Sequence, residues 1–167
     1  MTKPFSQELY DTYNESVINQ VTFNLHIKDH MILLNSDRYD VDLVILDVKG
    51  KSKGMPRGYI EVEYHGKYWK QAEFPFPTVH FLGRKTKYAG DHVYYVMTNY
   101  DGSSAVMIPF NKLVTYKKVR VTNVYVEGES MYNVPKADCV WGWAEIAKFI
   151  EADLAAPVKK VGLDQFT

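Results

Sequence analysis

Apolar and acidic positions alternate in two runs between residues 38 and 69, in the first half of the chain. In the first run Tyr39, Val41, Leu43 and Ile45 alternate with Asp40, Asp42, Val44 and Leu46. In the second run Ile60, Val62 and Tyr64 alternate with Glu61, Glu63 and His65. A period of two is typical of β-strands. The pattern therefore predicts a hairpin whose connection is basic and contains glycine.

The acidic positions of this hairpin predict a charged cluster. If the strands pair antiparallel about a turn near residues 51 and 52, Asp42 lies opposite Glu61 and Asp40 lies opposite Glu63. Like charges across a ladder are destabilising unless a cation or a shared proton relieves the repulsion. The alternative is a strand pair with one solvated face, since the connection is too long to determine the register.

Apolar spacing and turn residues predict the remaining elements. Phe5, Leu9, Tyr13 and Val17 recur at helical spacing, which predicts a helix from Phe5 to Gln20. The later segments predict a strand, a turn and a strand over 21–34, a short helical turn over 84–88, a hairpin turning at Asp101-Gly102, a strand over 117–126 and a helix over 143–154. The acidic residues of the first helix, Glu8, Asp11 and Glu15, are expected to be solvated, with the alternative that one of them leans over the hairpin.

Composition sets limits on the class of protein. Lys plus Arg and Asp plus Glu number 20 each, so the overall charge offers no argument for a nucleic-acid partner. The single cysteine, Cys139, excludes an internal disulfide framework and suits a reducing cytoplasm. No signal peptide and no membrane-spanning segment is recognisable, so we expect a cytoplasmic protein with no membrane partner.

The order of these pieces resembles the core of the PD-(D/E)xK nuclease superfamily, as found in small phage and bacterial members. That core has a helix, then antiparallel strands carrying an acidic residue, then a strand carrying E-x-K or a variant of it. The matching pieces are Asp42 within DVDLVI, Glu61 and Glu63 within YIEVEYHGKYW, and the pair Arg84-Lys85 within VHFLGRKTKY. The sequence departs from the signature because Glu63 occupies the usual lysine position and no proline precedes Asp42.

The resemblance implies a fold. It is an α+β fold with a central mixed β-sheet flanked by an N-terminal and a C-terminal helix, as in restriction endonucleases. The expected organisation is a single domain over residues 1–167, with a nuclease-like core at about 5–110 and a strand and helix extension at about 111–160.

The resemblance also implies an activity, a metal-dependent nuclease that hydrolyses phosphodiester bonds, with DNA as the expected partner and Mg²⁺ or Mn²⁺ as the cofactor. Asp42 and Glu61 are the implied metal ligands, and Glu63 is a ligand of a second ion or the general base. Lys85 is the implied catalytic lysine, which lowers the pKa of the attacking water or stabilises the phosphorane. Many members of the superfamily dimerise, so a homodimer is also expected.

Basic residues near the acidic runs are candidate phosphate contacts if they converge on the site. The candidates are Lys51, Lys53, Arg57, Lys67 and Arg84. The alternative for each residue is an ordinary solvated side chain. Two further functions remain open because the motif lysine is missing: an inactive nuclease-like protein that binds nucleic acid or protein, and a β-rich phage accessory or assembly protein.

Overall fold

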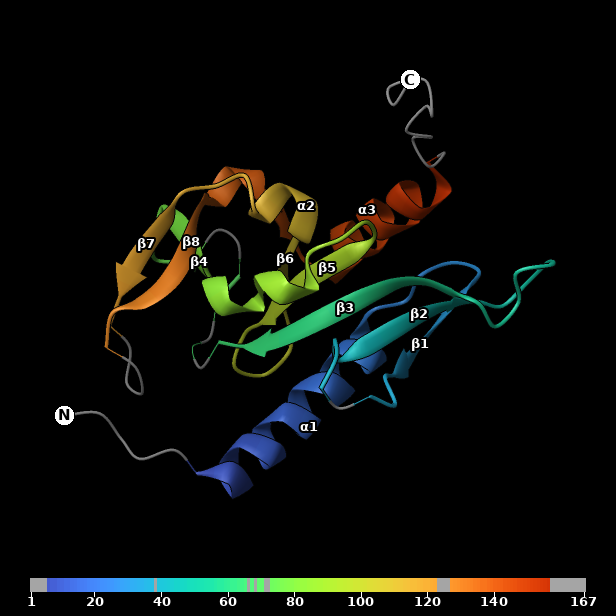
Figure 1. Ribbon diagram of the computed structural model, residues 1–167, viewed down its shortest axis with the longest axis horizontal. Helices are drawn as coiled ribbons and strands as arrows, with labels where there is room; N and C mark the ends of the chain where they lie inside the picture. Colours follow the sequence, from blue (N-terminus) through green and yellow to red (C-terminus); the bar gives the residue numbers. More distant parts are fainter. Residues whose placement is uncertain are drawn as a thin grey trace, which may run out of the picture.

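A computed structural model describes residues 6–37, 39–65, 67, 69–70, 73–122 and 127–156, with the backbone alone for residues 9, 10 and 13. The elements are α1 (Gln7–Asn24), β1 (His30–Leu34), β2 (Leu43–Asp47), β3 (Pro56–Tyr64), β4 (Thr78–Leu82), η2 (Gly83–Tyr88), β5 (Val93–Thr98), β6 (Ala105–Pro109), α2 (Phe110–Leu113), β7 (Lys118–Val121), β8 (Glu129–Pro135), η3 (Lys136–Asp138), β9 (Val140–Trp141) and α3 (Trp143–Ala155). The two η elements are 3-10 helices. The predicted α+β class is confirmed (Figure 1).

The main sheet has six strands in the order β1-β2-β3-β5-β6-β9. Its strands pair antiparallel except for β3 and β5, which run parallel from the pair Tyr59 and Val93 to the pair Tyr64 and Thr98. The predicted mixed sheet is therefore confirmed. The parallel pair requires a crossover, and the chain makes it through β4 and η2. This crossover carries Lys85 past the face of β3.

A second, three-stranded sheet has the order β4-β8-β7 and is antiparallel throughout. Only part of it follows the sequence prediction. The strand expected over 117–126 is present as β7. Residues 123–126 of the predicted strand lie outside the described part of the chain. Strand β8 was not predicted, although it pairs with both neighbours and completes this sheet.

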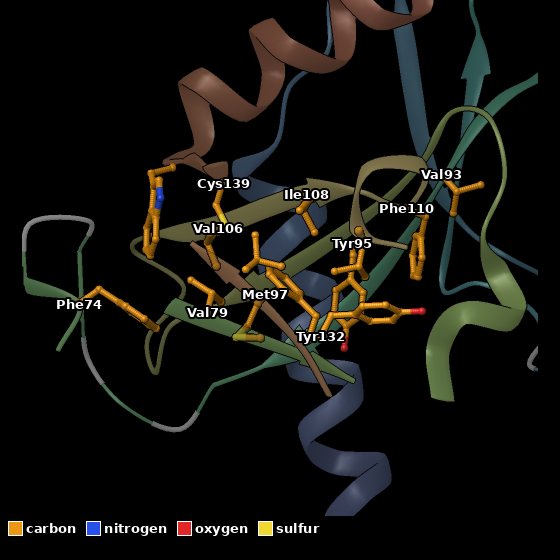
Figure 2. Close-up of a cluster of buried hydrophobic side chains, with 14 of the residues drawn as sticks. Phe74, Val79, Val93, Tyr95, Met97, Val106, Ile108, Phe110, Tyr132 and Cys139 are labelled. Carbon is orange, nitrogen blue, oxygen red and sulfur yellow. The ribbon is translucent and has the colours of Figure 1, made fainter. Parts of the chain in front are cut away.

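The main sheet is covered on both faces, and each face has its own core. One core joins Val17 and Val21 of α1 and Ile146 and Ile150 of α3 to apolar side chains of the sheet such as Ile60. The other core packs the opposite face against the small sheet and α2; Figure 2 shows its members Tyr95, Ile108, Phe110 and Tyr132. In Figure 1, α1 and the small sheet accordingly lie on different sides of β3.

The first helix and the segment after it differ from the prediction. The helix expected from Phe5 to Gln20 is α1, which continues to Asn24, while Phe5 lies outside the described residues. The first strand expected in 21–34 is therefore wrong, because Val21 and Leu25 extend the buried stripe of Val17 at helical spacing. The second strand of that segment is β1. No helix in the described part of the chain is long and apolar enough to span a membrane.

Candidate active site

The predicted register of the acidic hairpin agrees with the structure. Leu43 pairs with Ile60 at the end of the β2–β3 ladder, so the preceding residue Asp42 lies opposite Glu61. The backbone N–H of Val62 donates to Oδ2 of Asp42 at 2.8 Å, which fixes this carboxylate against β3. Burial raises the pKa of Asp42, while the hydrogen bond from Val62 and the charge of Lys85 act in the opposite direction.

Asp40 does not join this pair, so the predicted placement of Asp40 opposite Glu63 in the charged cluster is wrong. Its backbone N–H donates to the carbonyl of Asp37 at 3.2 Å, and its own Oδ1 accepts the N–H of Val41 at 2.8 Å. Asp40 is therefore an exposed residue of the turn that precedes β2. The alternation of the sequence continues through this turn, although the strand has not yet begun.

Glu61 forms the centre of the cluster. Its side chain is almost completely buried, at 1% exposure, and its Oε1 forms an ion pair with Nζ of Lys85. Burial and the nearby charge of Asp42 raise the pKa of Glu61 to about 7, against the opposing effect of Lys85. The other oxygen, Oε2, is buried and has no hydrogen-bond partner among the described residues.

Lys85 reaches Glu61 from η2, the short helical turn that the sequence predicted. This turn can pack closely on β8 because it begins at a glycine: a Cβ on Gly83 would lie 2.7 Å from the carbonyl oxygen of Ser130. Burial by itself lowers the pKa of Lys85, but the carboxylates of Glu61, Asp42 and Glu63 outweigh burial and raise it. The ammonium therefore stays charged and offsets part of the negative charge of the cluster.

Glu63 has a separate partner that the sequence analysis missed. The hydroxyl of Tyr95 donates to Oε2 of Glu63. Tyr95 is fully buried in the hydrophobic core that Figure 2 shows. The backbone N–H of Leu82 lies 3.4 Å from the same hydroxyl. Burial raises the pKa of Glu63, while the bond from Tyr95 lowers it. No local signal could have found this contact, because it depends on the parallel pairing of β3 with β5.

The fit to a cation rests on Asp42 and Glu61. Within the described residues, no three His, Cys, Asp or Glu side chains are grouped so that they alone would hold a metal ion. Mg²⁺ commonly uses one or two carboxylates and completes its shell with water and substrate phosphate. The carboxylate of Glu61 is paired with Lys85 through Oε1, but its buried Oε2 has no hydrogen-bond partner among the described residues, and a cation or a proton would satisfy it. The donor set therefore fits Mg²⁺ or Mn²⁺ held by two carboxylates.

The acidic residues of the first helix lie elsewhere. Glu8, Asp11 and Glu15 are exposed, and α1 packs against Ile60 and Val62. Those two residues face away from Glu61 and Glu63, because alternate residues of a strand point to opposite faces. The structure therefore supports the expectation that these acids are solvated.

The candidate phosphate contacts do not converge. Arg57 lies at the start of β3, where it donates to the carbonyl of Leu154 at 3.1 Å and its Nε lies 3.6 Å from Oδ2 of Asp47. Lys51 and Lys53 lie farther along the same hairpin, in the exposed connection that projects from the body in Figure 1. Lys67 is exposed beyond the other end of β3. Arg84 neighbours Lys85 in η2, and its charge acts on Glu63.

The comparisons with known proteins do not assign this chain to a family. No protein-family model matches the chain, and no curated protein matches it in sequence. Among solved structures it is similar to D212, a nuclease from a fusselovirus, with a TM-score of 0.47, 13% identity, and coverage of 92% of this chain and 97% of that one. A likeness at this level leaves the PD-(D/E)xK assignment a prediction. The chemistry of the site is therefore argued from its own side chains.

Proposed function

We propose that the protein is a metal-dependent nuclease that hydrolyses phosphodiester bonds, with DNA as the expected substrate. The observation that supports this most is the meeting of Asp42, Glu61 and Lys85, which come from the end of the β2 ladder, from β3 and from η2. Two carboxylates and one ammonium in a partly buried cluster provide the charges needed to handle a phosphodiester. Dimerisation and a cytoplasmic location stay predictions.

Asp42 and Glu61 would hold the cation, Mg²⁺ or Mn²⁺, through oxygens on one face of the hairpin. Such a cation neutralises the phosphate, orients the attacking water and lowers its pKa. Glu61 has to release its proton before it can bind a cation. Because its pKa is raised to about 7, metal binding by this residue is expected to strengthen as the pH rises through neutrality.

Lys85 and Glu63 would act on the reacting groups. The ammonium of Lys85 lies against Glu61 and is placed to share its charge with a phosphate oxygen that approaches the same carboxylate. Glu63 is the general-base candidate, because burial raises its pKa and a more basic carboxylate accepts a proton from water more readily. The hydroxyl of Tyr95 holds one oxygen of Glu63 and leaves the other for that role.

A second function, a nuclease-like protein that binds nucleic acid without cutting it, is favoured by a specific observation. Lys85 is already paired with Glu61, and Glu63 is already bound to Tyr95, so both side chains have partners inside the protein. A protein of this kind would keep the acidic cluster as a structural element. It would bind DNA and fail to cleave it.

Cleavage of labelled DNA in Mg²⁺ and in Mn²⁺, each compared with an EDTA control, separates these two functions. We expect Asp42→Asn and Glu61→Gln to lower the cleavage rate by about 100-fold or more, since each removes several kcal/mol of charge stabilisation. Glu145→Gln is the matched control, because Glu145 is an exposed acid on α3 whose partner is Lys148. Unchanged cleavage in both variants would refute the assignment of Asp42 and Glu61 to the active site. DNA binding without cleavage by the wild-type protein would favour the second function.

A further inference from the structure

The turn η2 contributes more than Lys85 to the surface beside the acidic cluster. Arg84, Lys85, Lys87 and Tyr88 line a hollow of about 190 Å³. At about 30 Å³ for each water molecule, this hollow holds on the order of six waters. That is room for a phosphate group and part of the sugar attached to it. Every charged side chain of the lining is cationic, which predicts an anionic ligand.

The cations of this hollow differ in how far they are already neutralised. Lys85 is paired with Glu61, and Nε of Arg84 donates to Glu129 at 3.0 Å. That contact uses one edge of the guanidinium and leaves its terminal N–H groups to bind an incoming acceptor. Lys87 forms no ion pair with an acidic side chain in the part of the chain that the structure describes. Lys87 and Arg84 are therefore the groups that an anion would meet first.

Tyr88 organises the two lysines. Its ring centroid lies 4.8 Å from Nζ of Lys87 and 5.9 Å from Nζ of Lys85, so both ammonium groups lie within the range of a cation–π interaction. Its ring packs against the core on this face of the sheet, and its hydroxyl lies 3.4 Å from the carbonyl oxygen of Tyr39. The ring is thus a fixed, half-buried surface in the wall of the hollow. An aromatic surface of this kind also suits contact with a sugar or a base.

We propose that Arg84, Lys87 and Tyr88 form a phosphate subsite that anchors a nucleic-acid strand next to Asp42 and Glu61. Lys85 belongs to both the hollow and the acidic cluster, since it lines the hollow and is bound to Glu61. A strand held by one phosphate in the hollow would present a neighbouring phosphodiester to the carboxylates. That the phosphate belongs to a nucleic acid rests on the proposed function. That the hollow takes a phosphate rests on its own lining.

The test measures binding in the absence of cleavage. A fluorescein-labelled single-stranded DNA oligonucleotide is titrated with the full-length protein in EDTA, at several salt concentrations, and anisotropy is recorded. We expect Lys87→Gln and Arg84→Gln each to weaken binding by about fivefold or more and to lower the slope of log K against log salt by about 1, because each removes one phosphate contact. Tyr88→Leu is expected to weaken binding with the salt slope unchanged. Lys148→Gln, the same charge change at an exposed residue of α3, is the matched control.

The outcomes separate the possible sources of the phosphate. Preference for an oligonucleotide with a 5′-phosphate over one with a 5′-hydroxyl would identify a terminal phosphate, and equal binding of the two would identify a backbone phosphodiester. Competition by inorganic phosphate is expected in either case. If Lys87→Gln and Arg84→Gln behave like Lys148→Gln, or if polyglutamate of equal charge competes as well as the oligonucleotide, the phosphate subsite is refuted. Thermal melting checks that each variant is folded.

The phosphate subsite and the proposed nuclease activity can be refuted separately. A protein that binds DNA through Lys87 and Arg84 but cleaves nothing in Mg²⁺ or Mn²⁺ refutes the nuclease and keeps the subsite. A protein whose cleavage depends on Glu61 while both η2 variants bind and cleave like the wild type keeps the nuclease and refutes the subsite.

Discussion

The two faces of β3 carry different kinds of side chain. On one face Ile60 and Val62 are buried against α1 and the helix-covered core. On the other face Glu61 and Glu63 alternate with them and contact Lys85 and Tyr95. The two faces share one backbone and the same neighbouring strands. The difference between them is therefore a difference of side chains and of what the rest of the chain places over each face.

The apolar face contributes to stability more clearly than the charged face does. Burying an aliphatic side chain such as Ile60 contributes roughly 1.5–3 kcal/mol. A buried ion pair such as Glu61 with Lys85 is weak evidence for stability, because removing both charges from water offsets much of their attraction. A pair of this kind next to a second carboxylate, Asp42, has no clear structural benefit. The proposed nuclease site therefore lies on that face.

The largest expected effect on stability comes from the apolar face. Ile60→Ala should lower the free energy of unfolding by about 3 kcal/mol, because Ile60 is fully buried and its loss leaves a cavity between the sheet and α1. Urea denaturation followed by circular dichroism measures the change. Under conditions where this variant is folded, its metal-dependent cleavage should match the wild type. A selective loss of cleavage in the folded variant would show that the two faces are coupled.

Tyr95 and its neighbour Tyr94 allow a matched test of the two faces. Tyr95→Phe removes the donor to Glu63 and should lower the cleavage rate by about 10–100-fold, which is typical for a residue that orients a metal-site side chain. Tyr94→Phe is the control, because the Tyr94 hydroxyl donates to Asp153 of α3 on the other face.

The pH dependence shows whether Tyr95 positions Glu63 or only fills the core. The bond from Tyr95 lowers the pKa of Glu63, so its removal should move the rising limb of the pH–rate profile to higher pH. A reduced rate with an unmoved profile would assign Tyr95 a purely structural role.

The raised pKa of Glu61 predicts that stability falls as pH rises. Between the ordinary value of 4.5 and about 7 the folded protein keeps the Glu61 proton while the unfolded chain has lost it, so the unfolding free energy should drop by on the order of 2 kcal/mol across this window. Urea denaturation from about pH 5 to about pH 8 in metal-free buffer measures this slope. Glu61→Gln should make it shallower, and Mg²⁺ should offset the loss at the upper end. An equal slope in Glu61→Gln would assign the effect to other groups.

The smallest effect is expected on the helix side. Glu15→Gln should change cleavage by less than about twofold and stability by less than about 0.5 kcal/mol, since surface substitutions away from special features are nearly neutral. Glu15 is exposed and lines a separate hollow of about 740 Å³ with the turn at residues 101–103. A large loss of cleavage would show that an acidic residue of α1 contributes to the site and that the two faces of β3 are not functionally separate.

Local pattern determined much of this protein. The period of two in β3 separates Ile60 and Val62 from Glu61 and Glu63 without reference to the rest of the chain, because successive residues of a strand point to opposite faces. Glycine residues predicted the short turn η2. The Asp101-Gly102 pair predicted the hairpin formed by β5 and β6. The resemblance to a family predicted Lys85 as the catalytic lysine. The structure pairs Lys85 with Glu61, and the catalytic role stays a prediction.

Tertiary structure decided the rest, since contacts distant in sequence do not appear in any short window. The bond of Tyr95 to Glu63 depends on the parallel pairing of β3 with β5, which no local periodicity shows. Likewise, the position of η2 depends on the close approach of Gly83 to Ser130 of β8, a strand that the sequence does not predict. The separation of Lys51 and Lys53 from the cluster depends on the length of the extended hairpin. The sequence thus determined that Glu61 and Glu63 share one face of β3, while the fold excluded Asp40 from the cluster and the packing of the crossover determined which partners cover it.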